Sequence, residues 1–307
     1  MILSVSRRTD IPGCYPEWFM NRLRDKYVMT RNPMNFHQVS QINLSPDFIE
    51  CIVFWTKNAV PFMDYLEELN RMGYMYMFQY TITPYDNTLE KNISDKSDII
   101  KNVLELSEKI EKKRIVWRYD PILLNDTYTV NRHIELFEEM CSLLYTAVNH
   151  VVISFIDLYQ KNRGYRLYEL STDEITHLAQ AFGEIGAKYK LPIKTCCENY
   201  DLTKFGITKG ACIDSVLLEE ICNRPLLLKK ATGQRKNCLC AESVDIGAYH
   251  TCLNGCIYCY ATDYKRLKTK QKCYDKNSQI LCDKLDFGKD IIKVPVSYTH
   301  LTLPTKL

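Results

Sequence analysis

The chain has 307 residues, of which 46% are hydrophobic and 25% are charged, and its formal net charge is +3. This is the composition of an ordinary soluble globular protein, and the length suits one large α/β domain or two smaller ones. The small net charge disfavours a nucleic-acid partner, although a short basic segment at 265–272 leaves one open. No apolar run approaches the length of a membrane span, and the first residues lack a signal-peptide pattern, so we expect a cytoplasmic protein with no membrane partner.

Strand-like stretches that stop at turn or polar residues predict six β-strands in the first two thirds of the chain. They cover residues 2–6, 51–56, 74–83, 114–118, 151–156 and 193–197. The run at 51–56 is continuous, which is typical of a strand covered on both faces. Residues 27–44 are interpreted as extended chain that could form a hairpin.

Amphipathic patterns between these strands predict helices. They lie at about 17–26, 61–72, 95–112, 129–146 and 171–190, and a shorter helix is expected at 214–222. Ser171 and Glu174 have the spacing of a capping box. The alternation of strand and helix predicts an α/β fold, specifically a partial parallel (β/α)6 barrel of the TIM type with a C-terminal cysteine-rich loop.

Ionisable side chains recur where the predicted strands end. The candidates for cofactor binding are Arg7, Arg8, Lys57, Arg118, Asp157 and Glu198. Because the C-terminal ends of strands in a parallel barrel share the face that carries the active site, we expect these side chains to converge. Arg7, Arg8 and Lys57 could bind a carboxylate or a phosphate. The alternative is that each strand is simply followed by a polar loop, and no residue is assigned a catalytic role.

The chain contains fourteen cysteines, and five of them lie between residues 238 and 259. Cys252, Cys256 and Cys259 form a C-x3-C-x2-C array. Three thiolates in one short loop can ligate three irons of a [4Fe–4S] cluster, which leaves the fourth iron open to a small-molecule chelate. These three cysteines are therefore the predicted metal ligands.

Other interpretations of the cysteines stay open. Zinc could be held by four thiolates, although structural zinc sites usually pair two C-x2-C units and only one is present here; the thiols could also bind no metal. Cys238 and Cys240 could bind a second cluster, donate a fourth ligand or remain free of metal. Cys196 and Cys197 are adjacent in a predicted strand, where neighbouring side chains point to opposite faces, so at most one should face the barrel interior.

The element pattern divides the chain into three parts. We expect a barrel core at residues 1–200, a cysteine-rich iron–sulfur region at 201–272 and a tail at 273–307. Residues 296–305 fit no preceding pattern, and we interpret them as a segment that is not native to the protein.

The sequence resembles two known groups of proteins. The segment Cys256-Ile-Tyr-Cys-Tyr-Ala, with its array, resembles the radical S-adenosylmethionine superfamily in the form of its spore photoproduct lyase-like members. The chain as a whole resembles a bacterial domain-of-unknown-function family, number 1848, over about residues 1–262. The segments that carry this second resemblance are 4–12, 52–58, 117–122, 153–157 and the cysteine array. That family is described by a C-terminal cysteine cluster similar to the radical S-adenosylmethionine one, and no established reaction comes with it.

The superfamily resemblance implies a [4Fe–4S] cluster and S-adenosylmethionine as cofactors. It implies an electron donor such as a ferredoxin or flavodoxin, cleavage of the sulfonium S–C bond, and hydrogen abstraction by a 5′-deoxyadenosyl radical from an unknown small-molecule or macromolecular substrate. In the superfamily the cluster loop follows the first barrel strand, whereas here it follows the sixth predicted strand.

Two classes of function are therefore considered. The first is a radical S-adenosylmethionine enzyme of unknown substrate. The second is a binding module stabilised by zinc or a cluster, for nucleic acid or another partner, without catalysis. The recurrence of polar residues at strand ends favours the enzyme, because a binding module needs no such convergence.

Overall fold

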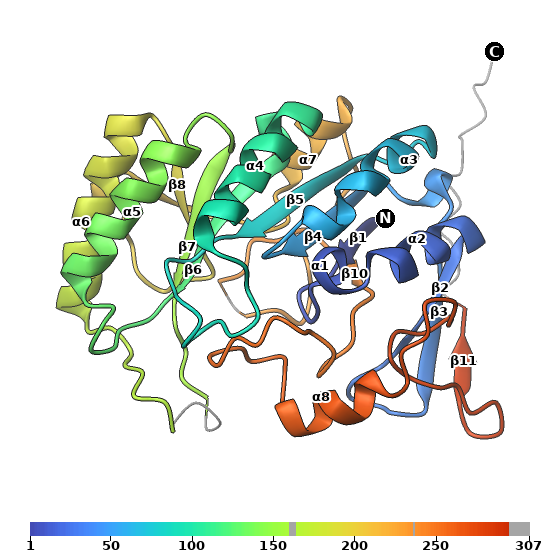
Figure 1. Cartoon of the computed structure of the whole chain (residues 1–307). Coiled ribbons are helices and arrows are strands. Elements are labelled where there is room, and N and C mark those ends of the chain that lie inside the picture. Colours follow the sequence, from blue (N-terminus) through green and yellow to red (C-terminus); the bar gives the residue numbers. More distant parts are fainter. Residues whose placement is uncertain (160–163, 236, 295–307) are drawn as a thin grey trace, which may run out of the picture.

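The computed structural model describes residues 1–159, 164–235 and 237–294, so the segment 296–305 interpreted as non-native lies outside the described residues (Figure 1). The described chain forms an α/β fold around one eight-stranded sheet in the order β10-β1-β4-β5-β6-β7-β8-β9. These strands are β1 (Ile2–Val5), β4 (Cys51–Thr56), β5 (Tyr76–Thr81), β6 (Ile115–Ile122), β7 (His150–Phe155), β8 (Ile193–Cys196), β9 (Ile207–Gly210) and β10 (Val244–Asp245).

All neighbouring strands of this sheet are parallel. The six predicted strands are confirmed as β1 and β4 to β8, but the predicted number was too low because β9 and β10 join them. Neither added strand carries an apolar run: β9 has four residues with an exposed middle, and β10 has two. Among the described residues β9 and β10 are the two edges of the sheet, which is therefore open.

Both faces of the sheet are buried, which explains the continuous apolar strands. In β4 the side chains of Ile52 and Phe54 pack into one hydrophobic core, whereas Cys51 and Val53 pack into a second core on the other face. Successive side chains of a strand point to opposite sides, so a run without polar residues is needed to fill two cores.

Helices cover one face, and a short helix with irregular chain covers the other. The helices are α1 (Ile11–Cys14), α2 (Pro16–Asp25), α3 (Leu66–Arg71), α4 (Lys96–Ile110), α5 (Val130–Leu144), α6 (Thr172–Tyr189), α7 (Ser215–Cys222) and α8 (Tyr264–Gln271). Figure 1 shows α4, α5 and α6 side by side along the sheet. Leu217, Leu218 and Ile221 of α7 pack in the core on the opposite face. The predicted capping box is confirmed, because Ser171 and Glu174 exchange both of its hydrogen bonds.

A smaller sheet lies beside α2. It consists of β2 (Tyr27–Arg31), β3 (Gln38–Asn43) and β11 (Ile291–Lys293), and β2 and β3 form the predicted hairpin. Arg31 holds the later chain against this hairpin through ion pairs of 2.9 Å with Asp283 and 2.7 Å with Asp290. No helix in the described residues is long and apolar enough to cross a membrane.

Stacked aromatic rings fix α5 and α6 to the sheet. The ring of Phe137 lies 3.8 Å from that of Phe182 and 5.4 Å from that of Trp117, measured between centroids, and both contacts are stacked. All three side chains are fully buried. Offset stacking adds to the free energy that these rings gain from burial alone.

Replacement of Phe137 by alanine tests this layer. We expect Phe137→Ala to lower the free energy of unfolding by about 3–5 kcal/mol, since it removes a buried ring and leaves a cavity between two others. Urea unfolding followed by circular dichroism measures the change. Leu143→Ala, on the same helix but exposed, should change it by less than about 0.5 kcal/mol. Equal losses in the two variants would contradict the assignment of the core.

Candidate functional site

One pocket of about 610 Å³ lies at the C-terminal ends of the parallel strands. It is lined by all nine residues that the sequence singled out: Arg7, Arg8, Lys57, Arg118, Asp157, Glu198, Cys252, Cys256 and Cys259. Parallel pairing explains the convergence, because it brings the end of every strand to the same edge of the sheet. The structure therefore brings these side chains together, while their individual roles stay predictions.

The loop that carries the cysteine array is fixed to the chain that follows β5. The amide of Ile257 donates to the carbonyl of Leu89 (3.0 Å), and the amide of Asn92 donates to that of Asn254 (3.1 Å). The side-chain amide of Asn92 also donates to the carbonyl of Leu253 (2.6 Å). Gly255 has a φ of +75°, and an added Cβ would lie 3.1 Å from Asn92, so a glycine suits this close approach.

The buried carboxylate of Asp10 fixes the other side of the same loop. It accepts hydrogen bonds from the side chain of Asn254 (2.8 Å) and from the amides of Lys57 (2.8 Å) and Gly13 (2.8 Å). One side chain thus joins the start of α1, the end of β4 and the cysteine loop. Burial raises the pKa of Asp10, and these hydrogen bonds oppose that rise.

A second buried carboxylate, Glu90, lies directly beside the loop. Its side chain is 1% exposed and accepts from Lys57 Nζ (2.7 Å), Lys96 Nζ (2.6 Å) and Thr83 Oγ1 (2.6 Å), and also from the hydroxyl of Tyr258. Burial alone would raise the pKa of Glu90, but the two ammonium groups outweigh it and lower the pKa to about 2. Lys57 is thereby held between Glu90 and the pocket.

The donor set of the loop fits an iron–sulfur cluster. Three thiols of one short segment face the same pocket, and the amide of Ala261 donates to Cys259 Sγ (3.3 Å), the kind of contact that tunes a ligating sulfur. Burial raises the pKa of the Cys256 thiol and Lys57 opposes this, while bound iron would itself favour the thiolate. A hydrogen bond that the Cys252 thiol donates to Cys14, followed by burial, raises the pKa of Cys252.

Among the residues that the structure describes, no group of three or more His, Cys, Asp or Glu side chains is arranged to hold a single metal ion. The ligands of zinc all lie about 2.0–2.3 Å from one point. Each thiolate of an iron–sulfur cluster instead binds its own iron, so its sulfur atoms are spread around the cluster.

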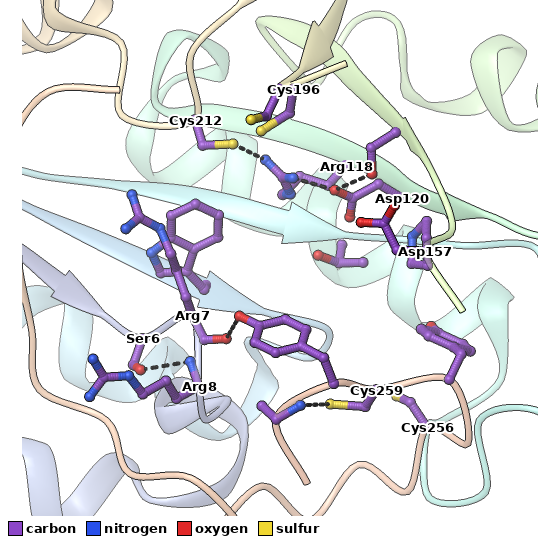
Figure 2. A pocket seen from close by; sticks show the side chains of 18 of the residues that line it. Ser6, Arg7, Arg8, Arg118, Asp120, Asp157, Cys196, Cys212, Cys256 and Cys259 are labelled. Carbon is purple, nitrogen blue, oxygen red and sulfur yellow. Dashed lines mark hydrogen bonds and ion pairs between the residues drawn. The ribbon is translucent and has the colours of Figure 1, made fainter. Parts of the chain in front are cut away.

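Two arginines that line the pocket contact the ring of Trp55. Trp55 was not identified as a site residue from the sequence. The guanidinium carbon of Arg7 lies 5.1 Å from the centroid of Trp55, and that of Arg118 lies 5.2 Å from it. Arg118 is committed to an ion pair with Asp120. No ion pair of the Arg7 side chain occurs within the described ranges, so Arg7 is available to an anionic ligand (Figure 2).

Arg8 is held at the pocket by β10 and the segment that follows it. Its Nη1 donates to the carbonyl of Gly247 (3.3 Å), and its Nε lies 4.0 Å from the carboxylate of Asp245. Asp245 also accepts from the hydroxyl of Ser6 (2.7 Å). A Cβ on Gly247 would lie 2.0 Å from the Ser6 oxygen, so only glycine fits there. In the sequence, the segment Asp245-Ile246-Gly247 is the feature that could have indicated this contact.

The two predicted carboxylates at the ends of β7 and β8 differ in environment. Glu198 accepts a hydrogen bond from the amide of Phe155 (3.0 Å), and burial raises its pKa to about 7. Asp157 is exposed and pairs with Arg235 at 2.5 Å. Glu198 can therefore gain or lose a proton near neutral pH, as a general acid or base requires.

The prediction that only one of Cys196 and Cys197 could face the interior was wrong, because both line the pocket. β8 ends at Cys196, and Cys197 has a φ of +59°. The strict alternation of a strand therefore no longer applies at the second cysteine. Nothing in the local sequence marks this change of backbone conformation.

A family model with the description "Domain of unknown function (DUF1848)" matches residues 2–261. The chain belongs to the DUF1848 family. The match includes the whole cysteine array and every strand of the large sheet, so the pocket lies within the DUF1848 domain. No curated protein matches the chain.

One similar solved structure is a Bacteroides thetaiotaomicron protein provisionally assigned as an alpha-L-fucosidase. It is 13% identical, covers 59% of this chain and 86% of its own, and has a TM-score of 0.24. A similarity this low bears neither on the fold nor on the function of the DUF1848 protein.

Replacement of Glu90 tests the support of the cysteine loop. We expect Glu90→Ala to lower the free energy of unfolding by about 3–5 kcal/mol, because it leaves the ammonium of Lys57 buried without its partner. Hydrogen exchange should also show faster exchange at Ile257, whose amide is bonded to the chain next to Glu90. Glu105→Ala, an exposed change on α4, is the matched control. Unchanged stability and exchange in Glu90→Ala would show that the loop is held by other contacts.

Proposed function

We propose that this DUF1848 protein binds a [4Fe–4S] cluster through Cys252, Cys256 and Cys259 and is a radical S-adenosylmethionine enzyme of unknown substrate. The observation that carries the proposal is the placement of these three thiols in the wall of a 610 Å³ pocket at the C-terminal edge of a parallel sheet. An open iron beside a cavity of this size can bind a small chelating molecule, which a cluster with four protein ligands cannot do.

The strand order supports a partial barrel. Seven strands follow one another in chain order, and the last strand of the domain, β10, pairs with the first, β1. This is the neighbour relation that a closing strand has in a parallel barrel. We therefore interpret the open sheet as a barrel that lacks closure between β9 and β10.

The same pairing accounts for the late position of the cysteine loop. The loop follows β10, and β10 lies beside β1, so the loop reaches the pocket next to the segment that follows the first strand. Contacts across this junction include the hydroxyls of Thr9 and Thr251 at 2.5 Å and the hydroxyl of Tyr15 donating to the carbonyl of Thr251 at 2.5 Å. The cysteine loop thus lies beside the segment that follows the first strand, which supports its interpretation as a cluster loop.

The cofactors would supply one-electron chemistry that ends in hydrogen abstraction from the substrate, with a ferredoxin or flavodoxin as electron donor. The residues of the chain bind the ligand, exchange a proton and exclude water. The guanidinium of Arg7 binds an anionic group of a ligand, and Glu198 exchanges a proton near neutral pH. The walls formed by Trp55 and Tyr258 exclude water from a site in which a reactive species must be protected.

The proposal is tested with protein purified without oxygen. We expect Cys256→Ala to lose about four irons and four sulfides per chain relative to a Cys273→Ala control; Cys273 does not line the pocket. The control, reduced in the presence of S-adenosylmethionine, should form 5′-deoxyadenosine, and Cys256→Ala should not.

The outcomes separate the parts of the proposal. Stoichiometric zinc without iron would contradict the proposed iron–sulfur enzyme and favour a zinc-stabilised binding module. If a cluster is bound but no 5′-deoxyadenosine forms, the cluster assignment is supported and the proposed radical reaction is contradicted. Equal iron content in Cys256→Ala and in the control would reject Cys256 as a ligand.

A further inference from the structure

Five further cysteines gather at a second place on the pocket. Cys196, Cys197, Cys212, Cys238 and Cys240 all line it, although they come from three separate stretches of the chain. Figure 2 shows the labelled Cys196 and Cys212 on one side of the pocket and the array of the cysteine loop on the other. We call these five residues the second thiol group. It is separate from the proposed ligands of the first cluster.

Contacts within the second thiol group centre on Cys212. This residue accepts hydrogen bonds from the thiols of Cys196 and Cys240. Arg118 Nη1 donates to its sulfur at 3.0 Å. The fifth member, Cys238, interacts electrostatically with Cys240 and with Cys197. Cys212 and Cys240 are 5% and 3% exposed, so the centre of the group is nearly closed to solvent, whereas Cys196 and Cys197 are partly exposed.

Backbone pairing brings these segments together. Cys196 ends β8, and its partner in β9 is Gly210, two residues before Cys212. The amide of Ala241 donates to the carbonyl of Ile213 (2.9 Å), which places the C-x-C segment beside Cys212. The side chain of Gln79 donates to the carbonyl of Cys212 (2.7 Å) and fixes its backbone. The grouping is thus built by the sheet and not by one flexible loop.

A buried cysteine usually packs as a small apolar side chain in a hydrophobic core. Cys51 and Cys222 fit that account, because their thiols form an isolated contact away from the pocket. The second thiol group differs in three respects: it has five members, all of them line the pocket, and a buried guanidinium donates to its centre. A cation beside clustered sulfur is what an anionic thiolate-ligated cluster needs for compensation of its charge.

We propose that the second thiol group holds a second iron–sulfur cluster, with Cys212 and Cys240 among its ligands and Arg118 donating to its sulfur. The proposal concerns a cluster, so the thiols of Cys196 and Cys240 would move apart from Cys212 as each ligand bound its own iron. Both clusters would then face one pocket from opposite sides. This inference does not depend on the reaction proposed for the cysteine loop.

Iron content of variants of the full chain, purified without oxygen, tests the inference. A Cys222→Ala control, which removes a thiol contact outside both groups, should bind about eight irons per chain if both clusters are of the [4Fe–4S] type. Cys212→Ala and Cys256→Ala should each lose about half of this iron, and the double variant should lose nearly all of it. The reduced single variants should show different electron paramagnetic resonance signals, because each retains a different cluster.

Cys240→Ala serves as a second variant, and circular dichroism checks that both variants fold. If folded Cys212→Ala and Cys240→Ala keep all the iron of the control, the second cluster is rejected and the cluster of the cysteine loop is unaffected. If Cys256→Ala alone keeps all its iron, the proposed function fails while the second cluster stands. Zinc in place of the second half of the iron would overturn the inference. A disulfide between Cys212 and Cys196 or Cys240, found by mass spectrometry with unchanged iron, would also overturn it.

Discussion

Parallel pairing of eight strands is the constraint on which the whole site depends. Strands that run in one direction deliver all of their C-terminal ends to one edge of the sheet. Residues as distant in sequence as Arg7 and Glu198 meet there without any contact of their own. The helices that connect the strands bury one face, and α7 with the chain after it buries the other. The pocket lies at this edge.

Buried carboxylates turn this edge into a defined site. Asp10 and Glu90 are both nearly inaccessible, and each is fully engaged by donors from separate parts of the chain. A buried charge is tolerated only where partners compensate it, and the same partners then fix the segments that carry them. The cysteine loop is held from two sides in this way. A loop that must present three thiols to a cluster gains a fixed geometry from such contacts.

The pocket combines unlike chemistry on its walls. Thiols stand on two sides, the guanidinium groups of Arg7 and Arg118 contact the ring of Trp55, and burial raises the pKa of Glu198 to about 7. The proposed iron–sulfur enzyme would use all of these groups, because it would bind an anionic ligand and move a proton. A module that needed metal only for its stability would have no use for a cavity of about 610 Å³ beside the metal.

The sequence by itself determined six strands and the cysteine array. Most of those strands are rich in apolar residues that fill both faces, and the array is a local spacing, so both can be read without knowledge of the fold. Only the tertiary structure decided the rest. The middle of β9 is exposed and β10 has only two residues, so neither has an apolar pattern of its own, and both form because neighbouring strands pair with them. The pairing of Lys57 with Glu90 and the grouping of Cys212 with Cys240 join residues far apart in the chain, and only the folding of the sheet brings them into contact.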